Sequence, residues 1–252
     1  MFVFEIQKYL FILARITSFI VVAPGISHRS IPNTSKVAFS LLLSWFVYSS
    51  VPDIGVYEHT LLFVISMLRE VIIGLAMGIV VRTAFAAVEM AGMVVDFQAG
   101  YAMGALFDPV SGTNASAYGR LFYWIALVVF FVGGFDHMLY TALVDSFGQI
   151  PPGEVLLENF RVDRFIYVFA NSFKIAFSIG APMILVLVTS DVTMGLISRT
   201  VPQINVFMLG MPLKSLIAMV MFLLILSTIM NMAAQNLALI PDYLQQVLGI
   251  FR

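Results

Sequence analysis

Long apolar runs, broken by prolines, glycines and single charged residues, most constrain what this chain can fold into. The runs lie at about 9–23, 37–51, 60–81, 121–135, 165–188 and 216–232. Of the 252 residues, 61% are hydrophobic and only 11% are charged, against about 25% charged in soluble domains. So few charges cannot cover a water-facing surface, so the chain is either a membrane protein or a subunit whose surface is largely buried by partners. We therefore expect an all-α, hydrophobic, membrane-associated fold with broken helices and helical hairpins.

The first two runs are shorter than a simple membrane span, which needs about 20 residues. Tilted helices and paired half-crossings both fit this length. Basic residues flank the first run on both sides, with Lys8 before it and Arg29 and Lys36 after it. The excess of basic residues that marks cytoplasmic loops therefore gives no orientation here.

Glycines and prolines predict where the helices break or meet. Gly133 and Gly134 predict either a bend or a close approach, and Pro212 is expected to close the apolar segment INVFMLGMP. Gly74 and Gly78 form a GxxxG pattern, which permits a close helix contact. The tail after Pro241 is amphipathic and predicts a short helix.

Several charges fall inside apolar patterns. Arg82, Glu89 and Asp96 recur every seven residues, which places them on one side of a helix. This side is either a solvated face outside the membrane or a polar inter-subunit or pore-lining face. Arg69 and Glu70 lie in the middle of the third run. We expect the buried charges to pair with partner subunits rather than carry protons, because an unpaired charge is costly there.

The segment GYAMGALFDPVSGTNASAYG, residues 100–119, interrupts two apolar patterns. It is rich in glycine, small residues and turn formers. A lipid-exposed loop would leave backbone groups unpaired, at several kcal/mol each. The loop must therefore be buried in protein, line a water-filled path or lie outside the bilayer, and the sequence leaves all three open.

Other function classes find little support. The net charge of −1 gives no electrostatic footprint for nucleic acid, and cysteine is absent. There is no GxxxxGK[ST] or HExxH motif, and the three histidines are scattered. We expect no enzyme activity, cofactor or metal. A polytopic secondary transporter stays open as an alternative, although no internal repeat supports it.

Four segments resemble one family. They are APGISHRSIPNTSKVAFS, AFAAVEMAGMVVDFQAGYAMGALFDP, LVDSFGQIPPG with the nearby His137, and RTVPQINVFMLGMPLK. Together they resemble the FliR/SctT family of type III secretion export gate subunits. Asn114 fits the flagellar branch better than the injectisome branch, whose SctT-type subunits remain an alternative.

The resemblance implies a single FliR-like domain over residues 1–252, with a FliP-like part at about 1–185 and a FliQ-like part at about 186–252. It implies a core subunit of the flagellar export gate, needed for flagellum biosynthesis. The gate would have a central pore with a plug loop for unfolded flagellar proteins. The implied partners are FliP-like, FliQ-like and FlhB-like subunits, export substrates and membrane lipid. The implied location is the bacterial inner membrane and the flagellar basal body, with much of the chain at the periplasmic side.

The resemblance also assigns two sets of residues. The pore and plug loop would contain Gly104, Leu106, Phe107, Asp108, Pro109, Gly112, Asn114 and Gly119. The candidates for subunit interfaces are Arg69, Glu70, Arg82, Glu89, Asp96, His137, Arg199, Pro202, Gln203, Asn205, Gly210, Pro212 and Lys214.

Overall fold

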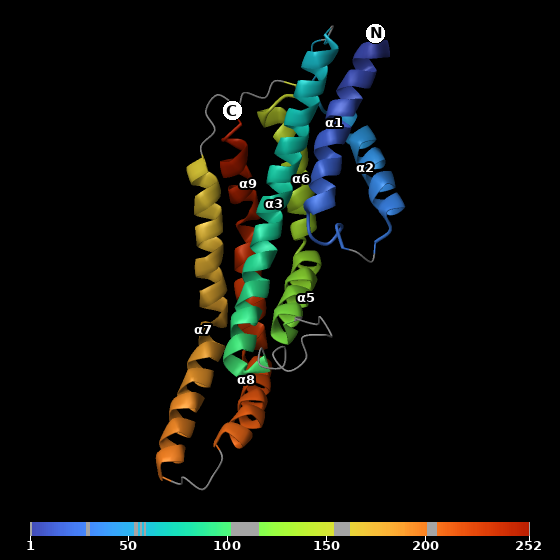
Figure 1. Cartoon of the computed structure of the whole chain (residues 1–252). Coiled ribbons are helices and arrows are strands. Elements are labelled where there is room, and N and C mark those ends of the chain that lie inside the picture. Colours follow the sequence, from blue (N-terminus) through green and yellow to red (C-terminus); the bar gives the residue numbers. More distant parts are fainter. Residues whose placement is uncertain are drawn as a thin grey trace. The chain divides into compact units, whose positions relative to one another are not determined.

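The computed structural model describes residues 2–28, 31–52, 55, 57, 59–101, 116–153, 162–200 and 206–251. Within these residues the regular structure is entirely helical, as predicted (Figure 1). The helices are α1 (Phe2–Val22), α2 (Asn33–Tyr48), α3 (Thr60–Ala99), α5 (Ala117–Val132), α6 (Phe135–Gln149), α7 (Val162–Thr200), α8 (Val206–Ala238) and α9 (Ile240–Leu248).

The chain divides into two compact units. Unit 1 comprises Met1–Ala84, Gly134–Ala170 and Ala238–Arg252, and unit 2 comprises Phe85–Gly133 and Asn171–Leu237. Helices α3 and α7 contribute to both units. This division follows contacts within the chain. The predicted division near residue 185 follows resemblance to two other proteins, and it stays a prediction.

Several helices are longer than the sequence predicts. Helix α3 runs unbroken through 40 residues, and α7 continues beyond the apolar run at about 165–188 to Thr200. The predicted break at Pro212 is wrong, because this proline lies inside α8. An interior proline removes one backbone hydrogen bond, but long apolar helices tolerate it where neighbouring groups satisfy the freed carbonyl.

Other ends follow the local sequence. Gly134 separates α5 from α6 with φ +70°, a left-handed conformation that favours glycine, so the predicted break there is confirmed. Helix α6 ends at Gln149, just before two prolines. Helix α9 begins at Ile240 with Pro241 in its first turn and buries one face, which confirms the predicted amphipathic helix.

Among the described residues, three helical segments are long and apolar enough to cross a membrane: Thr60–Ala99, Asp163–Thr200 and Gly210–Leu248. Helices α5 and α6 together form a fourth candidate, broken at the two glycines. Helix α2 has only 16 residues, which is short for a simple span.

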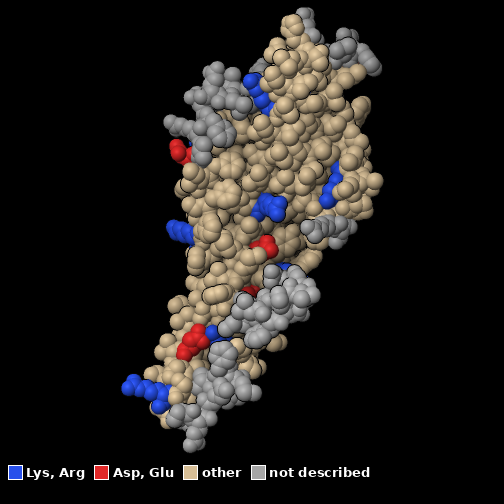
Figure 2. All heavy atoms as spheres, viewed as in Figure 1, with Lys and Arg blue, Asp and Glu red and all other residues tan. Residues whose placement is uncertain are grey.

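The surface is apolar, as expected for helices that could cross a membrane. Figure 2 shows a face on which residues other than Lys, Arg, Asp and Glu predominate. Large side chains such as Phe46, Phe97 and Leu224 are more than 70% exposed. A surface of this kind belongs in lipid or against other proteins.

The core of unit 1 forms where α1 packs on α3. Helix α1 buries Phe11, Ile16 and Phe19 completely. A Cβ atom at Gly74 would overlap the Ser18 hydroxyl and the Arg15 carbonyl, and one at Gly78 would lie 2.8 Å from the Val22 Cβ atom. The close helix contact that the GxxxG pattern permits is therefore present in the structure.

We expect Gly74→Ala to destabilise the protein by about 1–3 kcal/mol, because the added methyl group meets the α1 backbone. Thermal unfolding of the purified protein in a mild detergent measures the change. Gly148→Ala is the matched control, since a Cβ atom at this helical glycine meets no atom within 4 Å. Equal midpoints for the two variants would contradict the close packing of α1 on α3.

Candidate functional site

Most of the predicted plug loop lies outside the described residues. This holds for Gly104, Leu106, Phe107, Asp108, Pro109, Gly112 and Asn114. The residues on either side of 102–115 are described, and both sides belong to unit 2. Helix α3 leads into the loop, and α5 leads out of it.

Asp96 fastens the two sides of the loop together. It lies in the last turn of α3, only 4% exposed. Its Oδ2 atom accepts hydrogen bonds from the backbone N–H groups of Tyr118 and Gly119, at 3.0 and 3.2 Å, and from the Ser116 hydroxyl. The first N–H groups of a helix have no partner within the helix and carry partial positive charge. The Asp96 carboxylate therefore gives the first N–H groups of α5 a hydrogen-bond acceptor, and its negative charge complements their partial positive charge.

Close backbone contact reinforces this junction. A Cβ atom at Gly92 would overlap the carbonyl oxygen of Tyr118, so the helices meet at van der Waals distance. Ser116 is the N-cap of α5 and accepts from the Gly119 N–H at 2.8 Å. Gly119, predicted as a movable loop residue, instead lies in the first turn of α5. Its N–H is fixed by Ser116 and Asp96.

Helices α7 and α8 join the end of α3 in the same unit. The Lys214 ammonium lies 2.7 Å from Asp191 Oδ1, and the Gln98 amide donates to Asp191 Oδ2 at 2.8 Å. The hydroxyls of Tyr101 and Ser215 share a hydrogen bond. Lys214, predicted at a subunit interface, is thus paired within its own chain.

A second charged cluster lies in unit 1 around Arg15. Arg15 and Glu70 are both fully buried, and their Nε and Oε2 atoms are 2.6 Å apart. The guanidinium also donates to the carbonyl oxygens of Ser146 and Ile150, both at 3.0 Å. It lies 4.2 Å from the centroid of the Phe147 ring. A cation here complements the partial negative charge at the end of α6.

The other Glu70 oxygen also has a partner, because Oε1 accepts from the Gly153 N–H at 2.9 Å. The Arg15 cluster therefore connects α1, α3 and the end of α6. Glu70 pairs within its own chain, whereas the sequence led us to expect a partner subunit. Sequence reasoning did not select Arg15, although a lone arginine in an apolar run was the available signal.

The remaining interface candidates are dispersed. Arg82 is exposed, while Arg69 and Glu89 are partly buried on α3. Arg199 is exposed in the last turn of α7. Gly210 is buried and Pro212 exposed, both in α8. Pro202, Gln203 and Asn205 lie outside the described residues.

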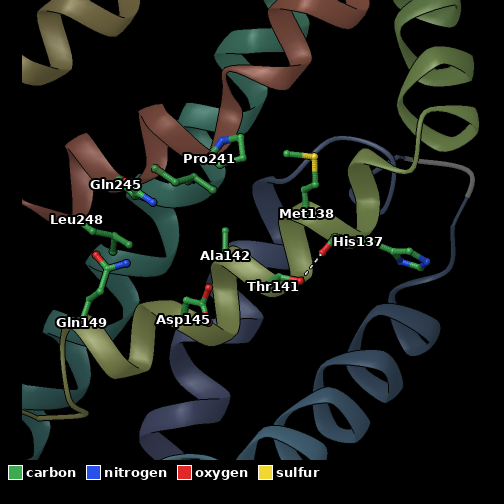
Figure 3. Close-up of a pocket in the computed structure, with 10 residues that line it drawn as sticks. His137, Met138, Thr141, Ala142, Asp145, Gln149, Pro241, Gln245 and Leu248 are labelled. Atoms are coloured by element: carbon green, nitrogen blue, oxygen red, sulfur yellow. Dashed lines mark hydrogen bonds between the residues drawn. The ribbon is translucent and has the colours of Figure 1, made fainter.

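His137 lies at a groove between α6 and α9, within unit 1 (Figure 3). The groove has a volume of about 350 Å³, and Asp145, Gln149 and Gln245 also line it. The His137 ring points away from α9, and its carbonyl accepts from the Thr141 hydroxyl at 2.9 Å (Figure 3). Within the described ranges, no three His, Asp or Glu side chains gather where they could hold a metal ion.

The fold, the Arg15 cluster and the Asp96 junction define a helical protein with an apolar surface, in which a buried ion pair and a hydrogen-bonded carboxylate connect the helices. The chain belongs to the bacterial export proteins, family 1, whose model matches residues 6–239.

Individual relatives cover nearly the whole chain. It is 29% identical to the flagellar biosynthetic protein FliR of Bacillus subtilis, over 96% of this chain and 95% of the relative. It is 28% identical to the Escherichia coli FliR, over 94% and 95%. It is 31% identical to the Yop proteins translocation protein T of Yersinia pestis, over 93% and 91%.

We expect Arg15→Met to cost about 3–5 kcal/mol of stability, because it leaves the Glu70 carboxylate buried without its cation. It also removes the donors to two carbonyls at the end of α6. Thermal unfolding in detergent and yield in the membrane fraction measure the effect.

Arg82→Met is the control, since Arg82 is exposed on the same unit. The double variant Arg15→Met/Glu70→Leu should be more stable than Arg15→Met alone, because no buried charge is left uncompensated. Equal stability of Arg15→Met and Arg82→Met would show that the Arg15 cluster contributes nothing.

Proposed function

We propose that this protein is a core subunit of the flagellar type III secretion export gate. It would help to form a central pore through which unfolded flagellar proteins leave the cell. Membership of an export family and the two FliR relatives support this proposal. The observation that carries the mechanism is the Asp96 junction, which holds both sides of the 102–115 segment together.

A pore for an unfolded chain must close tightly when it is empty. We propose that Leu106 and Phe107 close it, because apolar constrictions exclude water and ions. Gly104 and Gly112 would give the loop backbone freedom to move aside, and Asp108 before Pro109 would form a turn. Because Asp96 holds the end of α3 against the start of α5, motion would be confined to the loop between them. The loop could then open without separating the two helices.

We propose that FliP-like, FliQ-like and FlhB-like subunits cover much of the exposed apolar surface, with lipid covering the rest. In this proposal residues 1–185 resemble the FliP-like partner and residues 186–252 the FliQ-like partner. Arg82, Glu89 and Arg199 are the described charges we assign to these contacts. The gate would lie at the inner membrane in the flagellar basal body, with much of the chain at its periplasmic side.

An injectisome subunit is the second candidate. The Yersinia pestis relative is named as a translocation protein for Yop proteins and matches with 31% identity. Asn114 favours the flagellar branch. Deleting the gene from its own cells separates the two, because loss of motility identifies the flagellar role and intact motility identifies the injectisome role.

Deletion of residues 110–115 should leave assembly intact and make cells leaky to small solutes. Ser116 is kept because it caps α5. Uptake of a membrane-impermeant dye by intact cells measures the leak, and copurification with the partner subunits measures assembly. Asp96→Asn should leak less than the deletion, because it weakens the junction but leaves the loop at its full length.

Asp191→Asn is the matched control, as it alters an exposed carboxylate of the same unit that lies outside the junction. An assembled gate that stays tight after the deletion would rule out the plug. A leak of equal size in Asp96→Asn and Asp191→Asn would show that the Asp96 junction has no special role in closing the pore.

A further inference from the structure

We propose that a pocket between α1 and α2 binds the ammonium headgroup of an amine-bearing phospholipid such as phosphatidylethanolamine. The pocket lies within unit 1 and has a volume of about 290 Å³. Glu5, Ile6, Tyr9 and Leu10 of α1 line one side, and Trp45 and Tyr48 of α2 line the other. This site is separate from the loop junction, so it goes beyond the proposed function and does not depend on it.

Three aromatic rings form the wall of the pocket. The Tyr9 ring centroid lies 6.4 Å from that of Trp45, at 68°, and 6.5 Å from that of Tyr48, at 57°. The Tyr9 hydroxyl donates to the Leu41 carbonyl at 3.1 Å, which fixes the central ring against α2. Electron-rich ring faces attract ammonium groups within about 6 Å of their centroids.

The chain already uses one of these rings in this way. The Lys8 ammonium lies 4.6 Å from the centroid of Tyr48, and Lys8 itself is only 4% exposed. Trp45 is 74% exposed, and indole is the aromatic side chain that holds cations best. An incoming ammonium group therefore has Trp45 as its accessible partner.

Glu5 is the charged residue among those that line the pocket. Glu5 is exposed in the first turn of α1, and its side chain lines the pocket together with the rings. A carboxylate beside ring faces favours a cation and disfavours a bare phosphate. The buried Lys8 is a basic residue of α1 that also contacts one of the rings. Its ammonium group lies over the Tyr48 ring.

The surroundings favour a lipid as the source of the ammonium group. Leu42 and Phe46 are 71% and 77% exposed on α2 and continue the apolar surface from Trp45. A headgroup held among the rings would place its acyl chains along this surface. Tryptophan and tyrosine are also enriched where membrane meets water, the level at which headgroups lie.

The experiment uses the purified full chain with its copurifying subunits in a mild detergent. The protein has two tryptophans, so Trp124→Phe leaves Trp45 as the only indole of this chain. Phosphatidylethanolamine and phosphatidylglycerol with the same acyl chains are titrated in turn. Native mass spectrometry counts the retained lipids. In the isolated chain, Trp45 fluorescence reports binding at the pocket.

We expect phosphatidylethanolamine to bind more tightly than phosphatidylglycerol. Glu5→Gln and Trp45→Leu should each weaken this binding by about three- to tenfold. Trp45→Phe should retain part of the affinity, because it keeps an aromatic face. Asp242→Asn is the matched control, since Asp242 is an exposed acid in the first turn of α9, outside the pocket.

Four results would overturn the proposal. One is equal affinity for the two lipids, and another is an unchanged preference in Glu5→Gln. The third is binding of free ethanolamine as tight as that of the lipid, which would identify a soluble amine as the ligand. A crosslink from Trp45 to a partner-subunit lysine that persists when phosphatidylethanolamine is added would likewise overturn it. Because Glu5 and Trp45 are exposed, the variants should fold, and circular dichroism verifies this.

Discussion

The rest of this structure depends on finding partners for the charged and polar groups that lie buried among apolar helices. Arg15 is the clearest case, because one guanidinium neutralises Glu70 and satisfies two carbonyls at the end of α6. A buried ion pair adds little net stability over an apolar pair, but removing one partner is strongly destabilising. The cluster therefore specifies how α1, α3 and α6 pack within unit 1, and the neighbouring glycines of α3 allow the close approach.

Unit 2 applies the same principle to a loop. Asp96 satisfies the first N–H groups of α5 from the end of α3, so the base of the 102–115 segment is fixed by charge and by backbone contact. Gln98 and Lys214 bind the exposed Asp191 close by. A movable plug requires fixed residues on either side of a glycine-containing segment. The junction provides them, and it therefore supports the proposed export function.

The sequence predicted much of the fold because apolar runs, glycine pairs and prolines act locally. The all-helical class, the break at Gly133–Gly134, the close contact at Gly74 and the amphipathic last helix were all predictable. The continuity of α8 through Pro212 was not predictable. The free energy lost with one backbone hydrogen bond is smaller than the free energy gained by packing along the whole helix, and the local sequence does not reveal that packing. Glu70 pairs with Arg15, 55 residues away along the chain, and Asp96 pairs with Tyr118, 22 residues away. Pairing over such separations leaves no periodic signal in the sequence.

We propose that this chain is one subunit of a larger gate and that other proteins, as well as lipid, cover its exposed apolar side chains. Native mass spectrometry of the tagged chain, purified in mild detergent from its own cells, tests this most directly. A gate subunit should yield a defined complex that contains this chain and two kinds of small helical subunit. A stable particle of this chain alone, active in transport by itself, would contradict it.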